Sequence, residues 1–82
     1  MRPFIRDLKK MKKRGKDLSK LKILSDILAL NINVPEKYKK HKLLGNYKGH
    51  WECHIEPDWV LIYKKTDDIL IFMYTGSHSD LL

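Results

Sequence analysis

The stretch that decides the fold runs from residue 50 to residue 63 and reads His50-Trp51-Glu52-Cys53-His54-Ile55-Glu56-Pro57-Asp58-Trp59-Val60-Leu61-Ile62-Tyr63. In residues 50–56 polar and apolar residues alternate, which is typical of a strand with one buried face. The apolar face carries Trp51, Cys53 and Ile55, and the polar face carries His50, Glu52, His54 and Glu56. Pro57 and Asp58 favour a turn, and the continuous apolar run at residues 59–63 predicts a central strand over residues 59–64. The stretch therefore predicts an antiparallel hairpin.

A third strand follows the hairpin. Thr66, Asp67 and Asp68 favour another turn, and residues 69–75 complete an antiparallel meander. Gly76 ends this strand and leaves a short tail, residues 77–82, that carries His78.

Two helices precede the strands. Pro3 suits a first helical turn, and apolar residues recur at intervals of three and four over residues 3–14. Gly15 interrupts the pattern and Asp17 is a good N-cap. The helical period restarts before Pro35 with Leu18, Leu21, Leu24, Ile27 and Leu28. The sequence predicts one α+β domain over residues 1–82, in which a helical hairpin packs on a small antiparallel sheet.

A lysine-rich segment, residues 34–49, separates the helices from the strands. It contains Pro35, Gly45, Asn46 and Gly49, which favour turns and irregular backbone, so we predict a basic loop. The chain has a formal charge of +7, which is compatible with a polyanionic partner or with a merely solvated surface.

The compartment can be inferred from what the chain lacks. Cys53 is the only cysteine, so no intramolecular disulfide can form, and a reducing cytoplasm is expected. The apolar runs are too short to span a bilayer, so no membrane association is predicted.

Histidines and carboxylates are the candidates for chemistry. Metal-independent RNA cleavage needs a base for the 2′-hydroxyl proton, an acid for the leaving oxygen and positive charge around the phosphate. Antiparallel strands can bring together His41, Glu52, His54, Asp58 and His78. Spacing alone also allows scattered surface histidines, and His41, His54, His78 and Asp58 could in principle bind zinc. Because neither an HExxH pair nor a paired cysteine motif is present, we predict no metal and no cofactor.

Residues 38–82 resemble the YafQ-like branch of the RelE toxin superfamily. The matching blocks are Tyr38-Lys39-Lys40-His41-Lys42-Leu43, Leu44-Gly45-Asn46-Tyr47-Lys48-Gly49, Glu52-Cys53-His54-Ile55-Glu56-Pro57-Asp58-Trp59-Val60-Leu61-Ile62-Tyr63 and Thr75-Gly76-Ser77-His78-Ser79-Asp80-Leu81. The resemblance implies a toxin of a type II toxin–antitoxin system, an endoribonuclease that cuts ribosome-bound mRNA and is silenced by a cognate antitoxin.

The resemblance also implies roles for individual residues. The positions matching His41, Glu52, His54, Asp58 and His78 would surround the scissile phosphate. We expect RNA contacts from Lys37, Lys39, Lys40, Lys42, Lys48 and Trp59.

The chain departs from the family pattern at several points. Trp51 and Tyr74 stand where family members often carry arginine, and Leu82 stands where a terminal aromatic is common. Residues 1–3 leave no room for the family's first strand, so we predict a sheet that lacks it. These departures keep an alternative open, a catalytically weak module of the same fold that binds antitoxin or ribosomal RNA.

Overall fold

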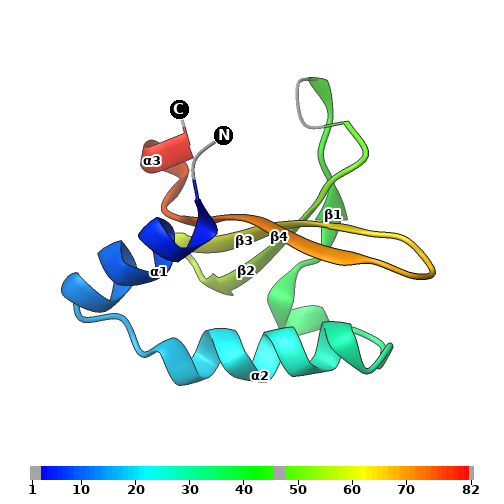
Figure 1. Ribbon diagram of the computed structural model, residues 1–82, viewed down its shortest axis with the longest axis horizontal. Coiled ribbons are helices and arrows are strands. Elements are labelled where there is room, and N and C mark those ends of the chain that lie inside the picture. The colour runs from blue at the N-terminus through cyan, green and yellow to red at the C-terminus, as the bar shows by residue number, and fades with distance from the viewer. Residues whose placement is uncertain (1–2, 46–47, 82) are drawn as a thin grey trace.

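The computed structural model describes residues 3–45 and 48–81. Four strands form one antiparallel sheet in the order β1-β2-β3-β4, so strands adjacent in the chain are adjacent in the sheet (Figure 1). The elements in chain order are α1 (Phe4–Lys13), α2 (Leu18–Ala29), the 3₁₀ helix η1 (Glu36–Tyr38), β1 (His41–Lys42), β2 (Trp51–Glu56), β3 (Trp59–Lys65), β4 (Leu70–Gly76) and α3 (His78–Leu81). The α+β prediction is confirmed.

The two long helices begin and end where the sequence indicates. Gly15 between them has a φ of 82°, a left-handed conformation that costs glycine little. The Asp17 side chain caps α2 by accepting a hydrogen bond of 3.0 Å from the Ser19 N–H. Within residues 3–45 and 48–81, no helix is both long enough and apolar enough to cross a membrane.

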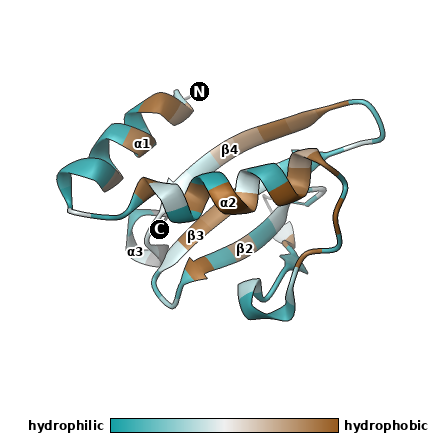
Figure 2. Cartoon of the chain, turned by 90° about the horizontal axis from the view of Figure 1, so that it is seen from below, coloured by the Kyte–Doolittle hydropathy of each residue, from teal (hydrophilic) through white to brown (hydrophobic). Residues whose placement is uncertain are grey.

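The main core lies between the helices and one face of the sheet, where α2 crosses the strands (Figure 2). Trp59 is completely buried there, and its indole N–H donates a hydrogen bond of 2.9 Å to the Thr75 hydroxyl. Cys53 is equally buried, while Trp51 and Ile55 pack against the same cluster. The apolar face predicted for β2 is therefore the face that meets the helices.

The opposite face of the sheet has a smaller apolar cluster. Val60 and Ile62 are fully buried and Tyr74 nearly so, with Leu43 and Met73 packed against them. Strand β3 is thus covered on both faces, which explains its uninterrupted apolar sequence.

The lysine-rich segment is more regular than predicted. It contains η1 and β1, and β1 pairs antiparallel with β2 so that His41 lies opposite Glu52 and Lys42 opposite Trp51. The prediction of an irregular loop was therefore wrong for His41 and Lys42. A two-residue strand is too short to show alternation, and it exists because β2 offers an edge for pairing. The turn residue Asn46 lies outside the described residues.

The predicted absence of a first strand concerns residues 1–3, of which 1–2 lie outside the described residues. From Pro3 onward no strand precedes α1 in the described part of the chain, and β4 borders the sheet.

The C-terminal helix α3 is tied to α1 through Asp80. Arg14 donates two hydrogen bonds to its carboxylate, of 2.6 and 3.0 Å, and Lys10 donates one of 3.2 Å. The Ser77 N–H donates another, of 3.2 Å. The Arg14 guanidinium is the main reason that the pKa of Asp80 lies well below its usual range.

Asp80→Asn should reduce stability at neutral pH but not in acid. Because the folded-state pKa is depressed, the carboxylate stabilises the fold above its unfolded pKa of about 3.9 and loses this effect as the pH falls through that value towards the folded pKa. Denaturant unfolding of both proteins between pH 7 and pH 2 measures the difference. Asp26→Asn is the matched control, since the Asp26 side chain forms an exposed ion pair with Lys22 within α2. A difference between wild type and Asp80→Asn that does not shrink in acid would contradict the assignment.

Candidate active site

Three of the predicted residues meet on the face of the sheet opposite the helices. His41 on β1 lies opposite Glu52 on β2, and His54 follows two positions along β2 on the same face. The Nε2 atoms of His41 and His54 each lie 3.2 Å from the same oxygen, Glu52 Oε1. The two imidazole rings are 5.7 Å apart between centroids. We call His41, Glu52 and His54 the His–Glu–His cluster.

The three side chains of the cluster differ in their exposure to solvent. The Glu52 side chain is 5% exposed, that of His54 20% and that of His41 48%. A carboxylate removed from water is costly unless hydrogen-bonding groups compensate it, and the two imidazoles are placed to do so. The carboxylate therefore forms the floor of the site, and His41 forms its solvent-facing rim.

The orientation of His41 is set by the backbone. Its Nδ1 lies 2.8 Å from the carbonyl oxygen of Lys39. A carbonyl only accepts hydrogen bonds, so Nδ1 carries a proton, and the other ring nitrogen, Nε2, is directed at Glu52. Lys39 adopts a left-handed conformation with φ of 48°, which no sequence signal indicated. This carbonyl is a positioning group that the sequence analysis missed.

A pocket opens beside His54 at the edge of β2. Because β1 pairs only with Trp51 and Glu52, the rest of this edge is left open by β1, and η1 lies next to it. The residues lining the pocket are Lys37, Lys39, His54, Ile55, Glu56 and Pro57. Two lysines beside an imidazole form a suitable environment for a phosphate group.

The negative charge of the Glu56 carboxylate at this pocket is paired with two lysines. Lys16 and Lys20 donate hydrogen bonds of 2.8 and 2.9 Å to it, and these contacts, Lys16 first, lower the pKa of Glu56. Its negative charge is therefore compensated from α2 and the turn before it.

The described lysines of residues 34–49, the basic segment, are exposed, and several lie over aromatic rings. The ammonium groups of Lys40 and Lys42 are 4.5 and 5.3 Å from the centroid of Trp51, and that of Lys37 is 5.2 Å from that of Tyr38. Lys48 is exposed just before β2. Cationic charge thus gathers at Trp51, the position at which the family pattern has arginine.

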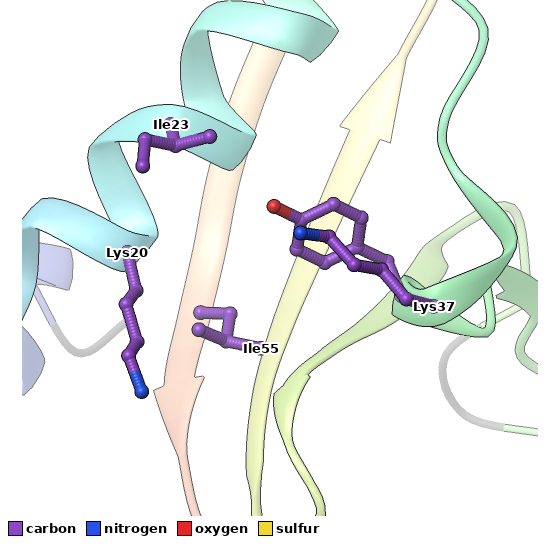
Figure 3. A pocket seen from close by; sticks show the side chains of 5 residues that line it. Lys20, Ile23, Lys37 and Ile55 are labelled. Atoms are coloured by element: carbon purple, nitrogen blue, oxygen red, sulfur yellow. The ribbon is translucent and has the colours of Figure 1, made fainter.

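A second groove lies on the helix side of the sheet. Figure 3 shows Lys20 and Ile23 of α2 across from Ile55 and Lys37, and Tyr38 completes the lining. This groove offers apolar surface and two cations rather than groups for proton transfer.

The structure does not place Asp58 in the cluster. Asp58 is exposed in the turn between β2 and β3. The pKa of Arg14 is raised mainly by Asp80 and slightly by the charge of Asp58. His78 begins α3, and its side chain lies outside the described residues. The strand register nevertheless aligns His54, Val60 and Gly76, so the chain leading to His78 leaves the sheet at the level of His54.

The prediction of an RNA contact for Trp59 was wrong. The residue has no exposed surface, because its ring fills the core between the sheet and the helices. Cys53 is buried as predicted, and burial raises the pKa of its thiol, which disfavours the reactive thiolate.

Comparison with known proteins gives consistent results. A family model described as the bacterial toxin of the type II toxin–antitoxin system, YafQ, matches residues 1–82. The mRNA interferase toxin YafQ of Escherichia coli K12 is 47% identical over 79 residues, which span 95% of this chain and 86% of that protein.

Solved structures agree in fold. YafQ in the crystal structure of the E. coli DinJ–YafQ complex has a TM-score of 0.90 at 46% identity, covering 96% of this chain and 89% of its own. A metal-bound toxin from Helicobacter pylori also has a TM-score of 0.90, at 37% identity, covering 100% of this chain and 93% of its own. The sequence match over the full length and the shared architecture show that the chain belongs to the YafQ family of bacterial toxins of type II toxin–antitoxin systems.

Proposed function

We propose that the chain is an endoribonuclease that cuts ribosome-associated mRNA in the cytoplasm, inhibits translation and is silenced by a cognate antitoxin. The observation that carries the proposal is the nearly buried Glu52 carboxylate, with an imidazole nitrogen 3.2 Å away on each side and a lysine-lined pocket next to it. The E. coli relative that bears the name mRNA interferase supports the substrate class.

The reaction requires no group beyond the protein and the RNA. The 2′-oxygen forms a bond to phosphorus while the bond from phosphorus to the 5′-oxygen breaks. The 2′-hydroxyl proton passes to a base, and an acid protonates the departing 5′-oxygen. The His–Glu–His cluster supplies proton-accepting and proton-donating groups, with Asp58 and His78 as further candidates at the same end of the sheet. The products are a 2′,3′-cyclic phosphate and a 5′-hydroxyl.

Positive charge for the reaction comes from lysines in this proposal. Lys37 and Lys39 line the pocket beside His54, so a phosphate placed there would lie between two cations and an imidazole. Lys40 and Lys42 lie over Trp51 and supply charge where the family pattern has an arginine. This placement favours an active enzyme over a purely binding module.

The proposed protein partner is an acidic antitoxin. E. coli YafQ has been crystallised with DinJ, and the net charge of +7 on this chain suits an acidic partner. We propose that the antitoxin competes with RNA for the basic segment.

Purified protein should cleave RNA in excess EDTA and leave 2′,3′-cyclic phosphate or 3′-phosphate ends, because the nucleophile is internal to the RNA. Because a toxin from H. pylori has been crystallised with a metal bound, comparing cleavage with and without EDTA is informative. Mass spectrometry of the cleaved ends, with and without EDTA, tests the expectation. Cleavage that disappears in EDTA would favour a metal-dependent hydrolase, and complete absence of cleavage would favour the binding module.

Reversing the charge of Lys37, Lys39, Lys40 and Lys42 to Glu should flatten the salt dependence of RNA affinity. Each lost phosphate contact should reduce the slope of log affinity against log salt by about 0.7. RNA binding measured across a salt series, with and without antitoxin, gives the slopes.

A variant with Lys9, Lys12, Lys13 and Lys64 changed to Glu is the charge-matched control, since these residues are exposed and lie outside the basic segment. Equal slopes for wild type and the first variant would show that the basic segment is only solvated.

A further inference from the structure

Trp51 and the His–Glu–His cluster lie on opposite faces of the same sheet edge. Lys42 is opposite Trp51 in the strand register, and His41 is opposite Glu52. Because side chains alternate along a strand and opposed residues share a face, Lys42 and Trp51 lie on one face and His41 and Glu52 on the other. The Trp51 ring packs against the main core but is only partly buried. An aromatic surface is therefore accessible one residue pair away from the cluster.

A pocket of about 440 Å³ opens beside this ring, and Lys42 and Lys48 line it together with apolar residues of the hairpin between β1 and β2. We call it the Trp51 pocket. Its size lies within the roughly 300–1,000 Å³ that is usual for sites that hold small ligands. The ammonium groups of Lys40 and Lys42 are 4.5 and 5.3 Å from the ring centroid. The pocket thus combines an aromatic surface with cations that reach solvent.

This combination suits a nucleotide better than an acidic peptide. The face of an aromatic ring is electron-rich, so it attracts cations and offers a carboxylate no favourable contact. A nucleotide uses both parts of the pocket, because its base can stack on the ring while its phosphate pairs with the lysines. We propose that Trp51 stacks with one unpaired base of the RNA substrate, and that Lys42 and Lys48 bind the phosphates beside that base.

The base has to displace an ammonium group from the ring. At an exposed site the contact between an ammonium group and an aromatic ring changes an equilibrium by about 2–5-fold. Stacking of one base on an aromatic side chain changes an affinity by about 5–150-fold. The exchange is therefore favourable, and the displaced lysine has a flexible stem that lets its charge move to the phosphate.

The position of the pocket relative to the cluster is a further part of the inference, and it rests on the proposed ribonuclease function. Strand β1 is the edge strand of the sheet and has only two residues (Figure 1). An RNA strand that passes around this short edge contacts Trp51 on one face and the cluster on the other. The stacked base would then flank the scissile phosphate. Because every base can stack, the pocket should add affinity rather than a strict base preference.

Binding can be measured without cleavage. End-labelled single-stranded oligodeoxynucleotides lack the 2′-hydroxyl nucleophile, and fluorescence anisotropy gives their affinity. Trp51→Leu should weaken binding by about 5–150-fold, while Trp51→Phe keeps a ring and should stay close to wild type. The slope of log affinity against log salt should be the same for Trp51→Leu and wild type, since no charge changes. Wild-type affinity in Trp51→Leu would overturn the proposal.

Phe4→Leu is the matched control, because it removes an aromatic ring at the opposite edge of the sheet. Phe4 packs against Phe72 of β4, with ring centroids 5.6 Å apart. Its affinity for the oligonucleotide should equal that of wild type, and a loss as large as that of Trp51→Leu would overturn the assignment to Trp51. Circular dichroism verifies that the variants fold.

A second measurement uses wild-type protein and does not depend on the folding of any variant. Stacking of a base quenches indole fluorescence, and Trp59 is completely buried, so quenching reports on Trp51. A saturating oligonucleotide should quench the emission, whereas an abasic oligonucleotide of equal length should bind without quenching. Equal quenching by both, or no quenching by either, would overturn stacking. Quenching by an acidic peptide alone would assign the pocket to a protein partner instead.

Cleavage assays separate this proposal from the proposed function. At subsaturating RNA, Trp51→Leu should lower the cleavage rate by the same factor as it lowers affinity. Lowered cleavage with unchanged affinity would overturn the binding role. If wild type does not cleave RNA at all, the proposed function fails, while the oligonucleotide measurements still decide whether Trp51 stacks with a base.

Discussion

His54→Ala and His78→Ala should each lower the rate of RNA cleavage by about 10²–10⁴-fold, because general acid–base catalysis contributes a factor of this size. His54 lies 3.2 Å from Glu52 and beside the lysine-lined pocket, and the chain leaves the sheet towards His78 at the same level. Single-turnover cleavage of a defined RNA gives the rates. Relief of growth arrest, after expression from a tightly repressed promoter, reports the same effect in cells.

The matched control for both substitutions is His50→Ala, which removes an imidazole beside the same strand but outside the cluster. It should keep wild-type cleavage and toxicity. Circular dichroism and thermal unfolding verify that all three variants fold. Undiminished toxicity of both His54→Ala and His78→Ala would refute the assignment of proton transfer to these residues.

Trp59→Ala should destabilise the fold by about 3–5 kcal/mol, the cost of removing a large buried aromatic side chain. Trp59 has no exposed surface, and its indole donates a hydrogen bond to Thr75 within the core. A loss of this size is a large part of the roughly 5–15 kcal/mol by which small proteins are stable. Denaturant unfolding measures it.

Trp59→Phe distinguishes a core role from an RNA contact. It keeps most of the ring volume and loses the hydrogen bond to Thr75, so it should cost about 1–3 kcal/mol. RNA affinity of the folded variant should equal that of wild type. A loss of RNA affinity without a loss of stability would restore the original expectation that Trp59 contacts RNA.

The sequence predicted those parts of the fold that are marked by a pattern within a short stretch of residues. Alternation at residues 50–56 gave β2 and its two faces, and Gly15 and Asp17 marked the boundary between the long helices. For Trp59 two sequence features disagreed, since the family resemblance predicted an RNA contact and the apolar neighbours of the residue predicted a buried strand. The prediction that Trp59 lies in a buried strand was correct.

The geometry of the site could not be predicted because it depends on tertiary pairing. Nothing local distinguishes His41 from the lysines around it, and only pairing with β2 places it opposite Glu52. Alternation put Glu52 on the polar face, but its burial follows from the packing of β1 and of the two imidazoles above it. The left-handed Lys39, whose carbonyl orients His41, is likewise a product of the folded chain.

The strand order has a consequence for how the molecule folds and opens. Because β1 to β4 pair in chain order, the contacts among His41, Glu52 and His54 join segments that are near in sequence, so little loop entropy opposes their formation. Docking of α1 is different, since the Thr75 N–H and the buried Asp7 carboxylate that join it to β4 are 68 positions apart. We therefore expect amide protons of β2 and β3 to outlast those of α1 in native-state hydrogen exchange. The residues proposed for catalysis would then lie in the part of the molecule that opens last. The basic helix α1 would be the part that detaches first.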